Sequence, residues 1–274
     1  MIRLNETFQN IYRLLYILRG KKPWTVGYTA YRRSMIQNVL QKGIFNAKNL
    51  PDGYGHRLDE RIIEYPWFFS RLPDKSGILL DAGSVLNFDF ILSLKALTSK
   101  KIFISTLAPE PQCFWNRGIS YIYEDLRETC YRDGYFDWIV SLSTLEHVGL
   151  NNTFLYTGDS KYNENLPEAY LAAVSEYNRI LKTGGTLFVS LPFGKYKNHK
   201  WFQVFDSSMV DRLIEVFSPS GLHEWHFRYT PEGWMMSSRE QSKDATCFDA
   251  SNRKSYDSDF AAFSRAIVCL EMVK

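Results

Sequence analysis

The sequence predicts an α/β protein built on an open, mostly parallel sheet, and three observations lead to that fold class. Residues 136–142 form a short apolar run rich in aromatic and β-branched residues, which is typical of a buried strand. Polar residues crowd the carboxyl end of this run, namely Ser143, Thr144, Glu146 and His147. Further apolar runs recur along the chain with helical patterns between them. Because open parallel sheets bind ligands outside the carboxyl ends of their strands, the sequence places a candidate site after residue 142.

Residues 1–76 precede the predicted sheet and form a helical extension. Helical patterns cover about 5–18 and 29–41. A loop rich in turn residues is followed by a helical pattern over 57–67. We expect that helix to break near Pro66, because proline lacks the N–H group that a helix interior needs.

Residues 77–274 form the predicted sheet domain. Its strands are expected at about 77–82, 101–106, 119–123, 136–142, up to 191, 222–229 and 262–272. Its helices are expected at about 87–98, 168–181 and 206–217, the second with a glycine stop and the third with an N-cap at Asp206. A polar, Ser-rich insertion covers about 231–260, and a long polar loop after Gly149 suits a wall on the substrate side.

Four motifs carry a resemblance to a known family. They are Ile78–Ser84, Tyr123–Arg127, Phe136–Gly149 and Arg179–Pro192, and they stand in the order and spacing of class I S-adenosylmethionine (SAM) dependent methyltransferases, which they resemble. The resemblance implies a Rossmann-like, doubly wound, seven-stranded sheet that is mostly parallel with an antiparallel last strand. It also implies a helical cap over residues 1–76 and a methyl-transfer activity that uses SAM as cofactor.

A finer resemblance concerns the acceptor. Glu146–Gly149, Tyr156–Asp159 and Pro192–Gly194 are similar to a subgroup associated with bacterial surface-polysaccharide and sugar-modification genes. That similarity implies O-methylation of a sugar, nucleotide sugar or glycan intermediate in polysaccharide biosynthesis. Methylation of another small polar metabolite is the alternative.

The family resemblance also implies a set of cofactor contacts. Its cofactor-binding residues are Asp81, Ala82, Gly83, Ser84, Thr106, Leu107, Asp125, Leu126, Ser143 and Thr144. Among them, Asp81 is expected to face the methionine end of SAM, and Asp125 to accept the adenine amino group.

Two positions depart from the family pattern. Val85 stands where a second glycine is usual, and Thr106 stands where an acid usually holds both ribose hydroxyls. A threonine hydroxyl cannot make that bidentate contact. Either Glu110 reaches back to the ribose, or the ribose is held more weakly, or SAM binding has been lost. The last possibility keeps open a non-catalytic binding or scaffold module. A dehydrogenase is disfavoured because the first turn lacks Gly-x-Gly-x-x-Gly.

Methylating a hydroxyl group needs a general base, and His147 is the first candidate by residue type and position, followed by His199 and Glu146. A structural role for His147 is the alternative, since the same motif also ends this strand in enzymes where the histidine is structural. No clustered metal ligands are evident in the sequence, so we predict a metal-independent enzyme.

Substrate contacts are predicted from three segments. The candidates are Tyr54, His56, Arg57, Tyr156, Lys195, Lys197 and Trp201. The first three belong to a segment that is either a lid over the pocket or a surface helix with its own side-chain pairs. The lysines near residue 195 suit an anionic substrate such as a nucleotide sugar, or form a solvated basic loop.

Bulk properties limit the partners and the compartment. A net charge of +3 with no long basic run argues against nucleic acid. Four cysteines without CxxC spacing fit a reducing cytoplasm. The chain has no apolar run of about 18 residues and no signal-peptide pattern, so we expect a cytoplasmic protein. The apolar face of the first helix is expected to pack on the domain or on a homodimer partner, with weak peripheral contact to a membrane as the alternative.

Overall fold

The computed structural model describes residues 6–153, 155, 158–249 and 255–274. The chain divides into two compact units. The first comprises residues 1–71 and 226–267, and the second comprises residues 72–225 and 268–274. The second unit holds most of the sheet, and the first holds the N-terminal helices.

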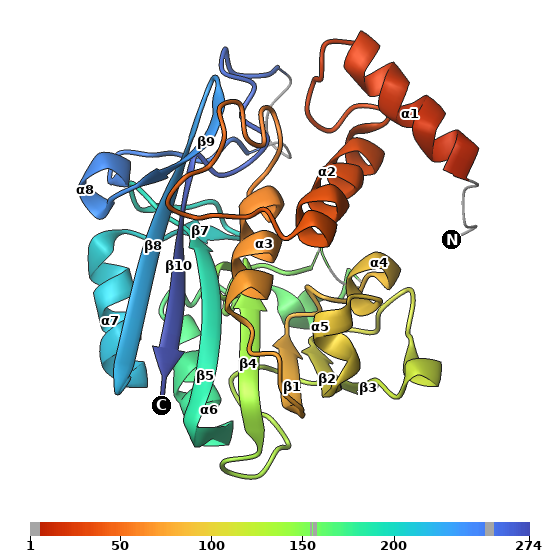
Figure 1. Ribbon diagram of the computed structural model, residues 1–274. Helices are drawn as coiled ribbons and strands as arrows, with labels where there is room; N and C mark the ends of the chain where they lie inside the picture. The colour runs from red at the N-terminus through yellow and green to blue at the C-terminus, as the bar shows by residue number, and fades with distance from the viewer. Residues whose placement is uncertain (1–5, 154, 156–157, 250–254) are drawn as a thin grey trace. The chain divides into compact units, whose positions relative to one another are not determined.

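The sheet confirms the predicted fold class. Its strands are β1 (Gly77–Ala82), β2 (Lys100–Thr106), β3 (Ser120–Tyr123), β4 (Phe136–Leu142), β5 (Leu181–Pro192), β8 (Gly221–Thr230), β9 (Gly233–Ser237) and β10 (Ala266–Val273). They are joined in the order β3-β2-β1-β4-β5-β10-β8-β9. β1 pairs in parallel with both β2 and β4, as in a doubly wound Rossmann-like sheet, and β10 runs antiparallel (Figure 1).

The expected strand count of seven is wrong, since the sheet has eight strands. The additional strand is β9, which lies in the segment predicted as a polar insertion and forms an antiparallel hairpin with β8. Only Pro231 and Glu232 separate the two strands, and Thr230 at the end of β8 pairs with Gly233 at the start of β9. Within β9, Trp234 is buried whereas Met235 and Met236 are both exposed, so the strand lacks the alternating pattern that would signal it in the sequence.

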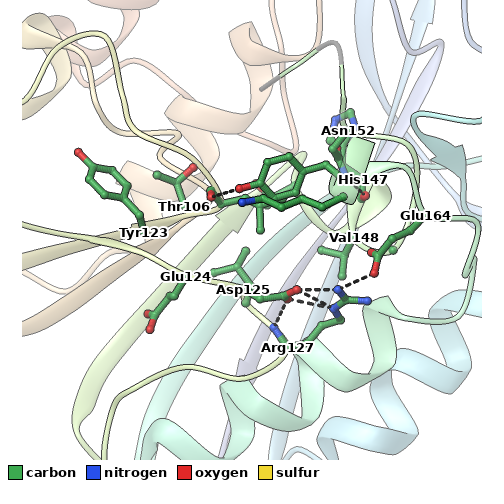
Figure 2. Close-up of a pocket in the computed structure, with 16 residues that line it drawn as sticks. Thr106, Tyr123, Glu124, Asp125, Arg127, His147, Val148, Asn152 and Glu164 are labelled. Atoms are coloured by element: carbon green, nitrogen blue, oxygen red, sulfur yellow. Dashed lines mark hydrogen bonds and ion pairs between the residues drawn. The ribbon is translucent and has the colours of Figure 1, made fainter. Parts of the chain in front are cut away.

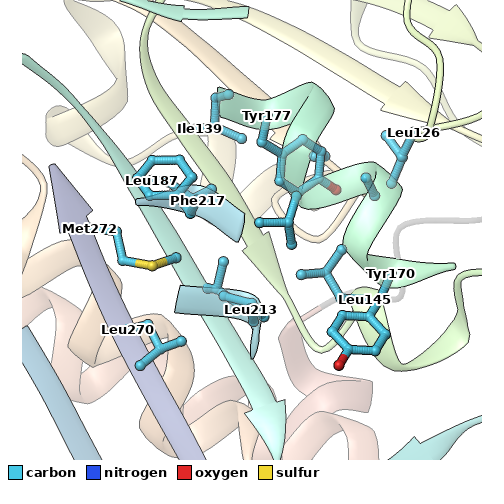
Figure 3. Packing of buried hydrophobic residues seen from close by; sticks show 14 of the residues in the cluster. Leu126, Ile139, Leu145, Tyr170, Tyr177, Leu187, Leu213, Phe217, Leu270 and Met272 are labelled. Atoms are coloured by element: carbon cyan, nitrogen blue, oxygen red, sulfur yellow. The ribbon is translucent and has the colours of Figure 1, made fainter. Parts of the chain in front are cut away.

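Helices of the second unit cover the sheet and close its core. They are α4 (Asp89–Leu92), α5 (Lys95–Thr98), α6 (Tyr170–Ile180) and α7 (Ser207–Phe217), with 3₁₀ turns η1 (Trp115–Arg117), η2 (Leu145–His147) and η3 (Ser160–Tyr162). Figure 3 shows Tyr177 of α6 and Phe217 of α7 in one buried cluster with Leu187 of β5 and Met272 of β10. The helix expected over 87–98 is split into α4 and α5. A pair of two-residue strands, β6 (Lys197–Asn198) and β7 (Gln203–Val204), follows β5.

α7 illustrates how local sequence sets an element. The side chain of Asp206 accepts a hydrogen bond from the N–H of Met209 at 3.0 Å, which is the predicted N-cap. The expected glycine stop after α6 is wrong, because β5 starts at Leu181, directly after the helix. Gly184 instead lies inside β5 with a φ of 75°.

The first unit contains α1 (Glu6–Leu18), α2 (Tyr28–Lys42), α3 (Arg61–Arg71) and the short α8 (Arg239–Ser242). The expected break at Pro66 is wrong, since α3 continues to Arg71. Pro66 cannot donate to the carbonyl of Ile62, one helical turn earlier. The phenol of Tyr54 donates a hydrogen bond to that carbonyl at 2.8 Å and satisfies it. A tertiary contact thus compensates for the proline.

α1 packs on its unit through its tyrosine side rather than its apolar side. The Tyr16 ring meets the Tyr28 ring at 5.8 Å, and Gly27 lets the backbone approach, since a Cβ there would lie 2.0 Å from the carbonyl oxygen of Tyr12. Packing of the apolar face on the domain, the first of the two expected arrangements, is wrong, because Leu14 and Leu18 are 57% and 73% exposed, and packing on a homodimer partner stays a prediction. Among the described residues, no helix has the length and apolar character needed to cross a bilayer.

Candidate functional site

A pocket of about 410 Å³ opens at the carboxyl ends of β1 to β4, within the second unit. Its volume lies in the range of small-molecule sites. The strand order reverses between β1 and β4, which is where doubly wound sheets bind their ligands. The pocket is lined by Gly83, Thr106, Leu107, Tyr123, Glu124, Asp125, Leu126, Arg127, Thr144, His147, Val148, Gly149, Asn152, Lys161, Tyr162 and Glu164. Six of the ten predicted cofactor residues are in that set.

The turn after β1 makes the floor of the pocket. Gly83 has a φ of 113°, and a Cβ on it would lie 2.3 Å from Oγ1 of Thr144, so only glycine fits. Asp81 does not line the pocket. Its buried carboxylate accepts the N–H groups of Val85 and Leu86 at 3.0 and 2.8 Å and thereby shapes the turn.

The next two residues, Ser84 and Val85, do not line the pocket. Val85 is buried, 6% exposed, so the position of the usual second glycine turns into the protein. Ser84 has a φ of 62°, and its buried hydroxyl oxygen has no hydrogen-bond partner among the described residues. Ser84, Ala82 and Ser143 are not pocket-lining residues, although all three lie beside lining residues in sequence.

Thr106, to which the family resemblance assigns the ribose contact, lines the pocket and is only 2% exposed. Glu110, which the sequence offered as a replacement acid, is not among the lining residues. Instead, Tyr162 covers this region, and its phenol donates to the carbonyl of Leu107 at 3.4 Å. The pocket around Thr106 therefore offers the threonine hydroxyl and backbone groups, with Glu124 also among the lining residues.

A network of charges surrounds Asp125, the residue to which the family resemblance assigns the adenine contact. Arg127 binds both carboxylate oxygens of Asp125, with its Nη2 2.6 Å from Oδ2, and also reaches Glu164 at 3.0 Å (Figure 2). Partial burial by itself would raise the pKa of Asp125, but the hydrogen bonds from Arg127 outweigh it and hold that pKa below its ordinary value. Asp125 is therefore a fixed, ionised acceptor at neutral pH.

His147 lies across the pocket from Thr106 (Figure 2). Its Nδ1 is 2.8 Å from the carbonyl oxygen of Trp201, and its ring stacks on the Trp201 indole with centroids 5.3 Å apart. Because a carbonyl only accepts, Nδ1 carries the hydrogen of a neutral ring and Nε2 carries the lone pair. Nε2 also lies 4.0 Å from the carboxylate of Glu146, which is 1% exposed. A histidine held in this tautomer can accept a proton.

The remaining catalytic and substrate candidates of the second unit that the structure describes do not line the pocket. Neither Glu146 nor His199 lines the pocket, and the His199 ring stacks on Phe202 at 4.3 Å. Lys195 and Lys197 are exposed and do not line it either. Trp201 contributes through His147, as its partner in the hydrogen bond and the stack.

Three substrate candidates belong to the first unit. Tyr54 supports α3, as described above. The Arg57 guanidinium lies over the Phe260 ring at 4.1 Å and donates to the carbonyl of Gly20. Burial lowers the pKa of His56. These contacts lie inside the first unit, and Tyr156 lies outside the described residues.

Sequence reasoning missed several lining residues. They are Tyr123, Glu124, Arg127, Val148, Gly149, Asn152, Lys161, Tyr162 and Glu164. The length of the loop after Gly149 was a signal for the segment, but no pattern singled out Lys161, Tyr162 or Glu164. In the described part of the chain, no group of three His, Cys, Asp or Glu side chains is arranged to hold a metal ion.

Comparisons with known proteins return similar solved structures only. No protein-family model and no curated protein matches the sequence. The [4+2]-cyclase SpnF is 14% identical, with 89% of this chain and 94% of that chain covered and a TM-score of 0.48. A SAM-dependent methyltransferase from Thermotoga maritima, described as a possible histamine N-methyltransferase, is 14% identical over 98% and 97%, with a TM-score of 0.45.

A third structure holds the demethylated form of the cofactor. It is the 1,6-didemethyltoxoflavin-N1-methyltransferase of Burkholderia thailandensis with bound S-adenosylhomocysteine, 13% identical over 73% and 72%, with a TM-score of 0.43.

Proposed function

We propose that this protein is a SAM-dependent methyltransferase that methylates a hydroxyl group of a sugar, nucleotide sugar or glycan intermediate. The observation that carries the proposal is one pocket that brings together Gly83, Asp125 and His147. These residues come from three separate motifs of the methyltransferase resemblance. The sugar acceptor is supported by the similarity of Glu146–Gly149 and Pro192–Gly194 to the polysaccharide-associated subgroup.

Three residues of the pocket suit SAM. The turn at Gly83 leaves room that a Cβ would fill, which suits the approach of a ligand to the backbone. Asp125 offers an ionised carboxylate at the position where the resemblance implies the adenine amino group. Thr106 can add one hydrogen bond at the ribose.

In this proposal the cofactor and the protein divide the chemistry. SAM, when bound, supplies an activated methyl group together with its own leaving group. The protein orients the acceptor and removes its proton. His147 takes the hydroxyl proton on Nε2 while Nδ1 keeps its bond to the Trp201 carbonyl. The nearby carboxylate of Glu146 stabilises the imidazolium that results.

The direct test is methyl transfer from SAM to a panel of nucleotide sugars, with product mass as the readout. We expect a gain of one methyl group on at least one hydroxylated acceptor and no such gain with Asp125→Ala at the same SAM concentration. Binding of SAM is measured by calorimetry alongside the assay. If the protein binds SAM but methylates no sugar, the methyltransferase proposal stands and the proposed sugar acceptor is wrong.

A non-catalytic binding module is the second candidate, and one observation favours it. Both oxygens of Asp125 are already engaged by Arg127, and Thr106 stands where the family resemblance places the acid that holds the ribose. A binding module that has lost its affinity for SAM releases no heat when it is titrated with SAM or S-adenosylhomocysteine. Calorimetry therefore separates the two candidates before any acceptor is known.

A further inference from the structure

α1 turns its apolar side outward, away from the unit that carries it. The exposed large apolar side chains of this helix are Phe8, Ile11, Leu14, Ile17 and Leu18, between 45% and 73% exposed, and we call them the outer face of α1. The opposite side of the helix holds the fully buried Tyr16. Scattered exposed apolar residues are ordinary, but a continuous apolar helix face marks an interaction surface.

The contacts inside the unit explain why the helix holds this orientation. The phenol of Tyr16 donates to the carbonyl of Lys21 at 3.0 Å, and the Tyr16 ring also meets the Tyr31 ring at 5.1 Å. Figure 1 shows α1 beside α2, the helix that supplies Tyr28 and Tyr31. Rotating α1 to bury Leu14 and Leu18 would expose Tyr16 and break these contacts.

The segment that carries the outer face is strongly basic. Between Glu6 and Asp52 the chain has eight Lys or Arg and no Asp or Glu. Residues 1–51 carry a net charge of +8, so the +3 of the whole chain leaves −5 for the remaining residues. Net charge alone conceals this asymmetry.

Several of these charges reach solvent. Arg32 pairs with Asp59, but Arg19, Lys22, Lys42 and Lys48 are exposed. Arg19 directly follows the last residue of α1, and Lys22 follows in the next turn of chain. Apolar side chains flanked by exposed cations are the pattern of a helix that lies in the interface of an anionic bilayer.

We propose that the outer face of α1 docks the protein onto a membrane surface rich in anionic phospholipid. The apolar side chains enter the boundary between headgroups and acyl chains, and Arg19 and Lys22 meet the lipid phosphates. Charge distinguishes this occupant from a second copy of the chain. A twofold pairing through α1 would bring two segments of +8 together, whereas an anionic surface attracts them.

The test is co-sedimentation of the full chain with vesicles of phosphatidylcholine alone or of phosphatidylcholine mixed with phosphatidylglycerol. We expect binding to the mixed vesicles, little binding to phosphatidylcholine alone, and a steep loss of binding as salt is raised. Leu14→Ser with Leu18→Ser should weaken binding at least tenfold, as each leucine buries apolar area. Arg19→Gln with Lys22→Gln should weaken it by about tenfold or more.

Matched controls use exposed residues of the second unit. Val216→Ser with Leu222→Ser removes two side chains that are 39% and 40% exposed, and Lys95→Gln with Lys101→Gln removes two exposed charges. Both controls should keep wild-type binding. The four altered residues, Leu14, Leu18, Arg19 and Lys22, are exposed, so melting temperatures should not move. The salt dependence of the wild type needs no variant at all.

Three results would overturn the proposal. One is equal binding, or no binding, to the two vesicle types. Another is a loss of binding in the control pairs as large as in the α1 pairs. The third is a dimer, seen by light scattering, that Leu14→Ser with Leu18→Ser dissociates, which would assign the face to a second copy.

Discussion

Asp125 and Thr106 stand at the ends of neighbouring strands and line the same pocket, yet their capacity to hold a cofactor differs. We expect Asp125→Ala to weaken SAM binding by about tenfold or more and Thr106→Ala to weaken it by a few-fold at most. A hydrogen bond to a charged group contributes more than one to a neutral hydroxyl. Titration calorimetry on both variants measures the difference.

The opposite order of effects would contradict the proposed placement of the cofactor in the pocket. A larger effect at Thr106 would show that the cofactor does not place its adenine beside Asp125. Arg127→Lys is the matched control, because it keeps a cation beside the carboxylate while removing the bidentate fork.

His147 makes a hydrogen bond that supports the structure and is also the proposed general base. The variant His147→Asn tests these two roles separately. An asparagine amide can still donate to the Trp201 carbonyl, but it cannot accept the acceptor's proton. We expect turnover to fall by roughly two to four powers of ten, the usual contribution of a general base. SAM affinity and melting temperature should change little. Near-normal turnover in this variant would rule out His147 as the general base. The same measurement on His199→Asn would test the second candidate.

At the scale of elements, α3 depends on a side chain outside it. Tyr54→Phe leaves the carbonyl of Ile62 without its donor, and an unsatisfied buried carbonyl costs about 1–3 kcal/mol. We therefore expect a lower melting temperature. Pro66→Ala restores the helical N–H, so the double variant should recover most of the loss. A double-mutant cycle measures this coupling, and strictly additive effects would contradict the compensation.

The start of α3 also predicts a pH dependence. Burial, reinforced by Asp59 and Glu64, raises the pKa of Glu60 from 4.5 to about 8. The folded protein thus holds a proton that the unfolded chain releases, so stability falls as pH rises from about 4.5 to 8. Glu60→Gln should remove this dependence and raise the melting temperature at pH 8. Thermal scans across that window give the answer, and a flat wild-type profile would disprove the assignment.

At the scale of the whole molecule, the second unit contains every residue that lines the pocket. Saturating S-adenosylhomocysteine at about 100 times its Kd should stabilise that unit by about 2.7 kcal/mol. Hydrogen exchange should slow around Gly83, Asp125 and His147 and stay unchanged in α1 and α2. Absence of any melting shift at millimolar ligand would refute the methyltransferase proposal.

Sequence patterns predicted the principal strands and the turns that line the pocket, because those features are local. Apolar runs of strand length marked β1, β2 and β4, and Asp206 marked the start of α7. The turn after β1 and the polar residues after β4 pointed to the edge of the sheet where the pocket lies. Periodicity and capping act within a few residues, so a single sequence contains them.

Tertiary structure alone decided which groups meet. It paired Arg127 with both Asp125 and Glu164, and it brought Tyr162 over Leu107. These contacts join residues separated by up to 55 positions. Their partners are chosen by packing geometry, which no local pattern encodes.

For the helices too, the sequence predicts some features and the tertiary structure decides others. The sequence by itself determined that α1 is amphipathic and that Pro66 lacks a donor for the carbonyl one turn earlier. Only the tertiary structure decided that Tyr16 buries the other side of α1 and that Tyr54 supplies the missing hydrogen bond. Propensity is a property of neighbouring residues, whereas burial and hydrogen-bond satisfaction depend on what the rest of the chain brings alongside.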